Sequence, residues 1–334
     1  MRLSVLDQSV AVTGRSADAS IRETLALAQH CETLVYQRFW VSEHHSHPTI
    51  VGSAPEVLMA AIAATTQRIR IGSAGVMLPH YSALKVAEQF RVLEALAPGR
   101  IDLGVGRAPG SDGRTAQLLN PQTRSAADHF PLQVRELQAW VSGTELPEGH
   151  PGRGVTAEPR GPTAPTLWML GSSNYGAQLA AHYGLPYAFA WFITDGQGAE
   201  EAIALYRELY RPSVQHPQPQ PALCLWALAA DTEEDAWHHF SGRERWKMDR
   251  NRGVLGALQS PAEVALLPYS PSEKIQAEQI RRSALVGSGA QVAEKLRHLA
   301  AALEIEELVV ITWAHDPAVR RRSYELLAAQ FRTD

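Results

Sequence analysis

Short apolar runs alternate with longer helical patterns along the 334-residue chain. Each run is rich in β-branched, leucine or aromatic residues, which is typical of strands. Strands that alternate with helices predict a parallel sheet, and eight strands are the number in a TIM barrel. The eight candidates are residues 3–6, 39–42, 69–78, 101–105, 166–170, 187–192, 223–230 and 307–313. The pattern therefore predicts an α/β fold with a single (β/α)8 TIM-like barrel domain over residues 1–334.

Three helices are predicted between the early strands, at residues 21–33, from Ala54 onward, and at residues 84–96. A Ser-Ala-Pro-Glu capping box introduces the second helix, and its predicted N-cap is Ser53. An Ala-Pro-Gly stop signal ends the third helix just before the next strand. Such short connections are typical of βα units.

Three polar segments interrupt this pattern, at residues 145–165, 211–221 and 241–283. Proline enrichment in the first two indicates loops, and the third is the longest insertion and follows the seventh strand. Because barrel chemistry lies on loops after the strands, residues 241–283 are a candidate lid over the site. The alternative is that residues 241–283 form a solvent-exposed helical insertion that does not cover the site.

Composition restricts the class of partner. Apolar residues make up 45% of the chain and charged residues 20%, with a net charge of −4, so there is no basic excess of the kind that nucleic-acid binding requires. Cys31 and Cys224 form no CxxC or zinc spacing and indicate a reducing compartment. No export signal opens the chain, and its apolar runs are shorter than the ~20 residues of a membrane span. We therefore expect a cytoplasmic protein with a small-molecule partner and no nucleic acid or membrane.

The fourth predicted strand ends in a glycine-rich turn. Alternation puts residues 101, 103 and 105 on the helix-facing side and Asp102, Gly104 and Gly106 on the inner side. Because glycine has no side chain, Gly104 and Gly106 would leave room for a flat ligand, although glycines can also mark a bulge. Arg107 follows at the strand's end, where its guanidinium can hold a phosphate. A structural salt bridge is the alternative role for Arg107.

A second candidate anion site follows the fifth strand. Ser172 and Ser173 lie in a small polar turn that leads into a helical pattern at residues 177–182. Helix N-termini and serine hydroxyls bind phosphate oxygens, but serine is also an ordinary N-cap. The prediction therefore depends on this turn lying close to Arg107.

A histidine cluster ends the second predicted strand. Alternation gives one face to Trp40, Ser42 and His44 and the other face to Phe39, Val41 and Glu43. His44 thus lies at the end where barrels place catalytic groups, as a general base or hydrogen-bonding group that Glu43 or His45 could orient. Metal binding by Glu43, His44 and His45 is the weaker alternative, because no second cluster with ligand spacing follows.

Residues 40–45, 70–79, 98–107 and 171–173 together resemble the bacterial luciferase-like flavin monooxygenase family. The similarity spans nearly the whole chain. It is closer to a subgroup of uncharacterised luciferase-like oxidoreductases than to the light-emitting subunits. The resemblance implies a barrel that binds reduced FMN at its carboxyl-terminal mouth and uses O₂ to oxygenate an organic substrate.

The resemblance also implies roles for single residues. His44 matches the catalytic histidine, and Arg107 and Ser173 match phosphate contacts, with Ser172 and Gly176 beside them. Ser73, Ala74 and Gly75 are assigned to the cofactor site, because the family carries a non-proline cis peptide beneath the flavin at the position of Ala74-Gly75. Gly106 replaces a reactive cysteine of the light-emitting subunits, which enlarges the expected pocket.

The sequence also suggests binding partners for the protein and alternative functions. No GxGxxG motif for NAD is present, so a separate flavin reductase would supply the reduced FMN. The alternatives are an F420-dependent oxidoreductase on the same fold, a noncatalytic flavin-binding protein and a metallohydrolase barrel. An alanine-rich helix at residues 57–64 would pair two copies in a homodimer, or would be covered within the barrel. Aromatic residues at strand positions favour an apolar substrate: Trp40, Trp191, Phe192 and Trp226.

Overall fold

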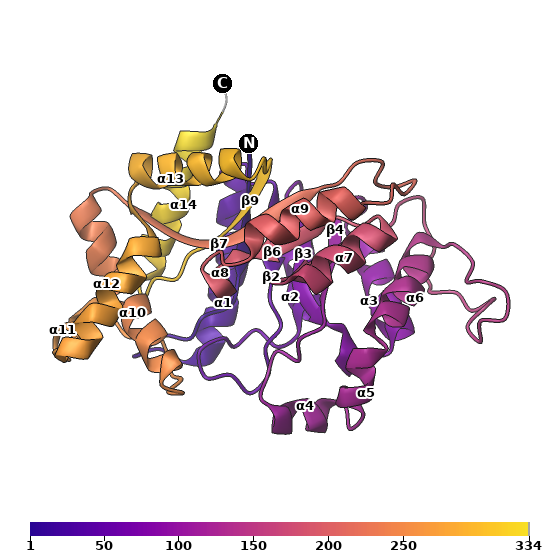
Figure 1. Ribbon diagram of the computed structural model, residues 1–334, viewed down its shortest axis with the longest axis horizontal. Helices are drawn as coiled ribbons and strands as arrows, with labels where there is room; N and C mark the ends of the chain where they lie inside the picture. Colours follow the sequence, from indigo (N-terminus) through magenta and orange to yellow (C-terminus); the bar gives the residue numbers. More distant parts are fainter. Residues whose placement is uncertain (333–334) are drawn as a thin grey trace.

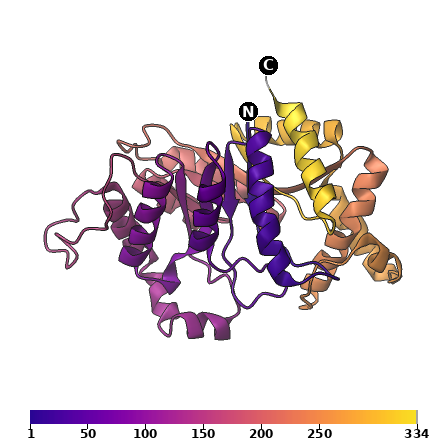
Figure 2. The same cartoon turned by 180° about the vertical axis from the view of Figure 1, so that it is seen from behind.

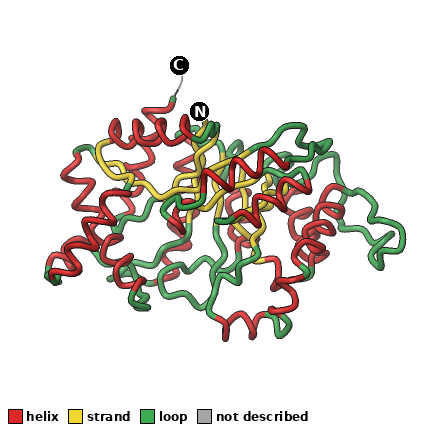
Figure 3. Tube along the Cα trace, viewed as in Figure 1, coloured by secondary structure: helices red, strands yellow, loops and turns green. Residues whose placement is uncertain are grey.

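The computed structural model describes residues 1–332, and the last two residues of the predicted domain lie outside that range. A closed barrel of eight parallel strands forms its centre, with β1 to β7 in sequence order and β9 between β7 and β1 (Figures 1 and 3). The barrel strands are β1 (Arg2–Asp7), β2 (Arg38–Val41), β3 (Arg70–Met77), β4 (Ile101–Gly106), β5 (Thr166–Gly171), β6 (Tyr187–Ala190), β7 (Pro221–Ala230) and β9 (Glu307–Ile311). The predicted barrel and its eight strands are confirmed, with one correction: the sixth strand ends at Ala190, and Trp191 and Phe192 begin helix α8 (Trp191–Thr194).

A ninth strand, β8 (Leu285–Ser288), was not predicted. It pairs in parallel with the carboxyl-terminal half of β7, with Ala227 opposite Leu285. Its sequence, Leu-Val-Gly-Ser, has only two apolar residues before a glycine, so it lacks the apolar run that marked the predicted strands. β8 fixes the end of the insertion to the rim of the barrel.

Helices connect the strands and cover the outside of the barrel, as the indigo and purple helices show in Figure 2. They are α1 (Ala17–Thr33), α2 (Pro55–Thr65), the 3₁₀ turn η1 (Leu78–His80), α3 (Ala83–Leu96), α4 (Gly113–Leu119), α5 (Thr123–Asp128), α6 (Phe130–Ser142), α7 (Asn174–Tyr183), α8 (Trp191–Thr194), α9 (Ala199–Leu209), α10 (Glu233–Asn251), α11 (Pro261–Ala265), α12 (Pro271–Ser283), α13 (Gly289–Ala302) and α14 (Pro317–Phe331). In the described chain, no helix has the length and apolar character needed to cross a membrane.

The start of α2 corrects one prediction. The N-cap is Ala54, not Ser53, and no side chain accepts a capping hydrogen bond there. Pro55 takes the first helical position, which suits its fixed φ and missing N–H, so the cap falls on the residue directly before it. The apolar face of this helix, including Met59 and Ile62, is buried in the barrel's outer core.

Alternation along β4 is as predicted. Ile101, Leu103 and Val105 are fully buried in the outer core between the strands and the helices. Asp102 lies on the opposite, inner side together with Trp40, whose Nε1 donates to its carboxylate at 3.0 Å.

Paired charges fill the amino-terminal end of the barrel interior. Arg38 donates to both oxygens of Asp102, at 3.0 and 2.8 Å, and to Glu307 at 2.7 Å. Arg70 adds a bond of 2.6 Å to Asp102. Each buried carboxylate therefore has a guanidinium partner, which offsets the desolvation of both charges. This network fills the amino-terminal end of the barrel interior with side chains that are already paired.

The long insertion is mostly helical. α10 to α12 follow β7 and lie on one flank of the barrel, in orange in Figure 1. Phe240 and Met248 of α10 and Ile280 of α12 pack in the same buried cluster as Trp226 of β7. The apolar side of α10 therefore reaches the barrel rim, where a lid would have to lie. Closure of residues 241–283 over the site stays a prediction.

Candidate active site

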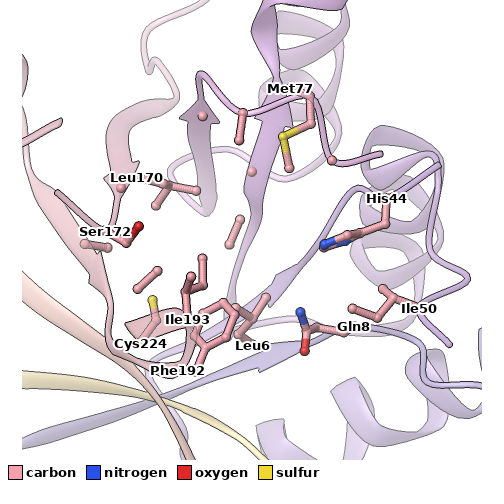
Figure 4. Close-up of a pocket in the computed structure, with 18 of the residues that line it drawn as sticks. Leu6, Gln8, His44, Ile50, Met77, Leu170, Ser172, Phe192, Ile193 and Cys224 are labelled. Carbon is pink, nitrogen blue, oxygen red and sulfur yellow. The ribbon is translucent and has the colours of Figure 1, made fainter. Parts of the chain in front are cut away.

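A cavity of about 450 Å³ opens at the carboxyl ends of the barrel strands. Its size falls in the range of small-molecule sites, about 300–1,000 Å³. Most of its lining is apolar, including Leu6, Ile50, Met77, Leu170, Phe192 and Ile193. His44 and Ser172 reach into it from opposite sides (Figure 4). The cavity can hold a largely apolar ligand that a few polar groups orient.

Arg107 and the start of α7 form one wall of this cavity. The Arg107 guanidinium lies over the Tyr175 ring, with 4.1 Å between Cζ and the ring centroid. Ser173 is the N-cap of α7, and its hydroxyl makes no capping hydrogen bond. Among residues 1–332, Arg107 has no ion-pair partner. The predicted neighbours Arg107, Ser172, Ser173 and Gly176 therefore meet around a site with free donors and positive charge, which suits an anion.

A break in the β3–β4 ladder forms a second wall. The strands pair up to Ser73 and again from Val76, so Ala74 and Gly75 stand out of register and line the cavity. The peptide bond between Ala74 and Gly75 is cis, as the resemblance implied. A Cβ on Gly75 would lie 2.7 Å from the Gly104 carbonyl oxygen, so only glycine fits at this position.

Ser73 and Gly106 were also predicted to contact the cofactor, but only Gly106 lines the cavity. Ser73 is fully buried and does not line the cavity. Its hydroxyl donates to the Gly104 carbonyl at 2.8 Å and accepts from the Gly104 N–H at 3.0 Å, so it supports the ladder break. Gly106 does line the cavity, where an added Cβ would meet only the Met77 sulfur at 3.8 Å. The expected extra space at Gly106 is present.

His44 follows β2 and extends its imidazole into the cavity (Figure 4). The ring lies 5.8 Å from the His47 ring, and its Nδ1 is buried with no hydrogen-bond partner among the described residues. Burial, aided by the charges of His47 and His45, lowers the pKa of His44 to about 4. The imidazole is therefore neutral at pH 7, and one of its nitrogens can donate while the other accepts.

Glu43 and His45 come together, but outside the cavity lining. The buried Glu43 carboxylate accepts from His45 Nε2 at 2.7 Å, from the Tyr81 hydroxyl at 2.7 Å and from the Met77 N–H at 3.1 Å. This network ties the end of β2 to the segment after β3. Neither side chain lines the cavity, so Glu43 and His45 could act there only by orienting the segment that carries His44, and this expected role stays a prediction.

Metal binding was the alternative role for Glu43, His44 and His45. Among the described residues, no group of three or more His, Cys, Asp or Glu side chains is arranged to hold a metal ion.

Of the four aromatic residues that the sequence suggested for the pocket, Trp226 and Phe192 line the cavity. Trp40 is fully buried beneath it, and Trp191 lies outside its lining.

Sequence reasoning missed several residues that line the cavity: Gln8, His47, Arg243, Trp246, Arg250 and Trp313. Gln8 directly follows β1, and its place at a strand end could have marked it. The residues of α10 had no such signal, because this helix is polar on most of its surface and is typical of a solvated insertion.

The sequence model of the luciferase-like monooxygenase family matches residues 1–304, and this chain belongs to that family. Two relatives from Bacillus subtilis are similar over nearly their whole lengths. The uncharacterised protein YwcH is 44% identical over 330 residues, which are 98% of each chain. A protein named N-acetyl-S-alkylcysteine monooxygenase is 36% identical over 332 residues, which cover 98% of this chain and 97% of that one.

Solved structures share the same fold. Apo-MsnO8 is 35% identical, with a TM-score of 0.89, over 99% of this chain and 98% of its own. The oxygenating constituent of 3,6-diketocamphane monooxygenase from Pseudomonas putida, in complex with FMN, is 19% identical with a TM-score of 0.70, over 98% and 96% of the chains. An F420-dependent secondary alcohol dehydrogenase with an F420–acetone adduct is 15% identical with a TM-score of 0.69, over 99% of both chains. The last two likenesses show a shared fold alone.

Proposed function

We propose that this protein is a monooxygenase that uses reduced FMN and O₂ to oxygenate a small, largely apolar organic substrate. The observation that carries the proposal is that one cavity is lined by Arg107 and Ser173, whose free donors suit an anion, and by a neutral histidine, His44. The family supplies the class of reaction. In the balanced reaction, substrate, O₂ and FMNH₂ give oxygenated substrate, water and FMN.

The residues present fit FMN. Arg107, the Ser172 and Ser173 hydroxyls and the first N–H groups of α7 would hold the phosphate, since all are free to donate. Ala74, Gly75 and Gly106 would face the ring system, because their small side chains leave a flat wall. Bound reduced FMN would supply the two electrons that reduce O₂.

His44 would act as the hydrogen-bonding group or base next to the reacting atoms. Its lowered pKa keeps the imidazole neutral, so at pH 7 it can accept a proton from one group and donate to another. Apolar side chains such as Leu6 and Phe192 would exclude bulk water from the same space.

Reconstitution with each cofactor tests the proposal against its rivals. The purified protein should bind FMN, as seen by flavin absorbance and fluorescence, and should transfer one atom of ¹⁸O₂ to product when a flavin reductase supplies FMNH₂. Binding of F420 with O₂-independent hydride transfer would favour the deazaflavin alternative. FMN binding without turnover of any aldehyde, ketone or sulfur compound would favour a noncatalytic flavin-binding protein. The relative named for N-acetyl-S-alkylcysteines makes thioethers the first compounds to screen.

Arg107→Ala should weaken FMN binding by about 1.5–3 kcal/mol, the usual scale of a charge-assisted hydrogen bond. Riboflavin, which lacks the phosphate, should bind the variant and the wild type alike. Fluorescence titration measures both affinities. Arg114→Ala is the matched control, because Arg114 is an exposed arginine of α4 outside the cavity lining. Unchanged FMN affinity in folded Arg107→Ala protein would remove Arg107 from the phosphate site.

We also propose a separate flavin reductase and a homodimer as partners. Within α2, Leu58, Met59 and Ile62 face the core, whereas Val57 is exposed, so a pairing surface on this helix would use its outer side. Light scattering at micromolar concentration tests the dimer, and a monomer mass would contradict it.

A further inference from the structure

Arg243 differs from the other buried arginines of the described chain, which are Arg38, Arg91 and Arg320. Arg38 and Arg320 pair with carboxylates, and Arg91 donates to three backbone carbonyls. The Arg243 side chain is only 8% exposed, yet its Nε has no partner, and its guanidinium forms no ion pair with any of residues 1–332. An unpaired buried charge is costly unless something opposite in charge approaches it.

Three tryptophans surround this guanidinium. Its Cζ lies 4.5 Å from the Trp226 ring centroid, 5.4 Å from that of Trp313 and 5.9 Å from that of Trp246. Ring faces attract a cation but do not neutralise it, and they accept no full hydrogen bond from its N–H groups. The Nε1–H of Trp226 is also buried without a partner. Arg243 and all three tryptophans line the same cavity as His44.

A second arginine raises the positive charge on this wall. Arg250 lies two turns further along α10, lines the cavity at its exposed edge and has no ion-pair partner in the described residues. No Asp or Glu of residues 1–332 lines the cavity. The neighbouring Asp195 is held by Lys247 at 2.6 Å, and Asp249 pairs with Arg245 at 3.1 Å.

Burial lowers the pKa of Arg243 to about 10, with Asp195 opposing and the positive charge of Arg250 adding to this effect. The guanidinium therefore stays protonated at neutral pH. Two positive charges face a cavity wall that offers them no negative group. A ligand that brings a carboxylate would pair with both guanidinium groups and with the free Trp226 N–H.

We infer that Arg243 and Arg250 bind a carboxylate of the organic substrate, whose apolar body then extends along the cavity towards His44. This inference rests on the proposed function, since it names the substrate class of the same site. The inferred acid site uses residues other than those of the proposed phosphate site, since Arg243 and Arg250 lie on α10 whereas Arg107 follows β4. The substrates are therefore small apolar carboxylic acids, not neutral hydrocarbons or ketones.

Matched probes test this directly, without added cofactor. Binding of 5-phenylpentanoate and of its neutral amide, 5-phenylpentanamide, can be followed by calorimetry and by quenching of tryptophan fluorescence. The wild type should bind the acid at least ~10-fold more tightly than the amide, the effect of a charge-assisted hydrogen bond. Arg243→Met, which keeps the length and packing of the side chain, should remove this preference. Arg250→Gln, at an exposed position where folding is not at risk, should reduce it.

Two controls locate the acid. Arg245→Gln removes a charge from the same helix at a residue paired with Asp249 and Glu273, and it should leave the preference unchanged. Arg107→Ala should also leave it unchanged, and loss of the preference in that variant would overturn the inference by placing the acid in the phosphate site. Equal binding of acid and amide by a wild type that binds FMN would overturn this inference alone. Failure to bind FMN, with the acid preference and its loss in Arg243→Met intact, would overturn the proposed cofactor and leave the acid site supported.

Discussion

His44→Ala should retain FMN binding and lower the formation of oxygenated product by ~10²-fold or more, the usual effect of removing a general acid or base. FMN binding should persist because the proposed phosphate contacts, Arg107 and Ser173, follow other strands than His44 does. Reduced flavin should still be oxidised by O₂, but with hydrogen peroxide released in place of product. Parallel assays of FMNH₂ consumption, peroxide and product measure this uncoupling.

Controls for this prediction come from the neighbouring network. His45→Ala and Glu43→Gln should change coupling less than His44→Ala, because neither side chain lines the cavity. The pKa of His44 near 4 means that its protonation should contribute no inflection at pH 6.5 to the profile of kcat/KM. Any loss from protonating His44 should appear only as the pH falls towards 4. Full coupling in a well-folded His44→Ala enzyme would remove His44 from the mechanism.

Asp102→Ala should lower the free energy of unfolding by about 3–5 kcal/mol, because it leaves Arg38 as a buried charge with one partner fewer. Burial alone would raise the pKa of Asp102, but Arg38 and Arg70 outweigh it and lower the pKa. The carboxylate therefore stabilises the fold above its unfolded pKa near 4, and that contribution is lost as the pH falls through the lower folded value. Urea titrations at pH 7 measure the difference.

Asp231→Ala is the matched control for Asp102→Ala. Asp231 also pairs with an arginine, Arg322 at 2.6 Å, but both side chains are about half exposed. Removing this exposed pair should change the free energy of unfolding much less than Asp102→Ala does, because solvent screens the two charges. Equal effects of the two substitutions would contradict the stabilising role of the interior charge network.

Local patterns in the sequence were sufficient for the barrel and for part of the site. The period-2 alternation of residues 101–106 identified which side chains face the helices, because a strand's two faces are a property of its own backbone. Arg107, Ser172 and His44 could be placed for a similar reason, since parallel barrel strands bring their carboxyl ends to one rim. Ser53 shows the limit of such reasoning at a single residue, because Pro55 decided where α2 begins.

Only the tertiary structure decided which distant side chains meet. Trp226 of β7, Arg243 of α10 and Trp313 after β9 have no periodic relation in the sequence, and α10 by itself is typical of a solvated helix. Packing of Phe240 and Met248 against the barrel turns one edge of that helix into a cavity wall. The sequence by itself thus determined the family, the barrel and the candidate flavin-binding edge, since these depend on local periodicity and motifs. The burial of Arg243 without an acid, and with it the inferred acid site, depends on long-range packing that no local pattern encodes.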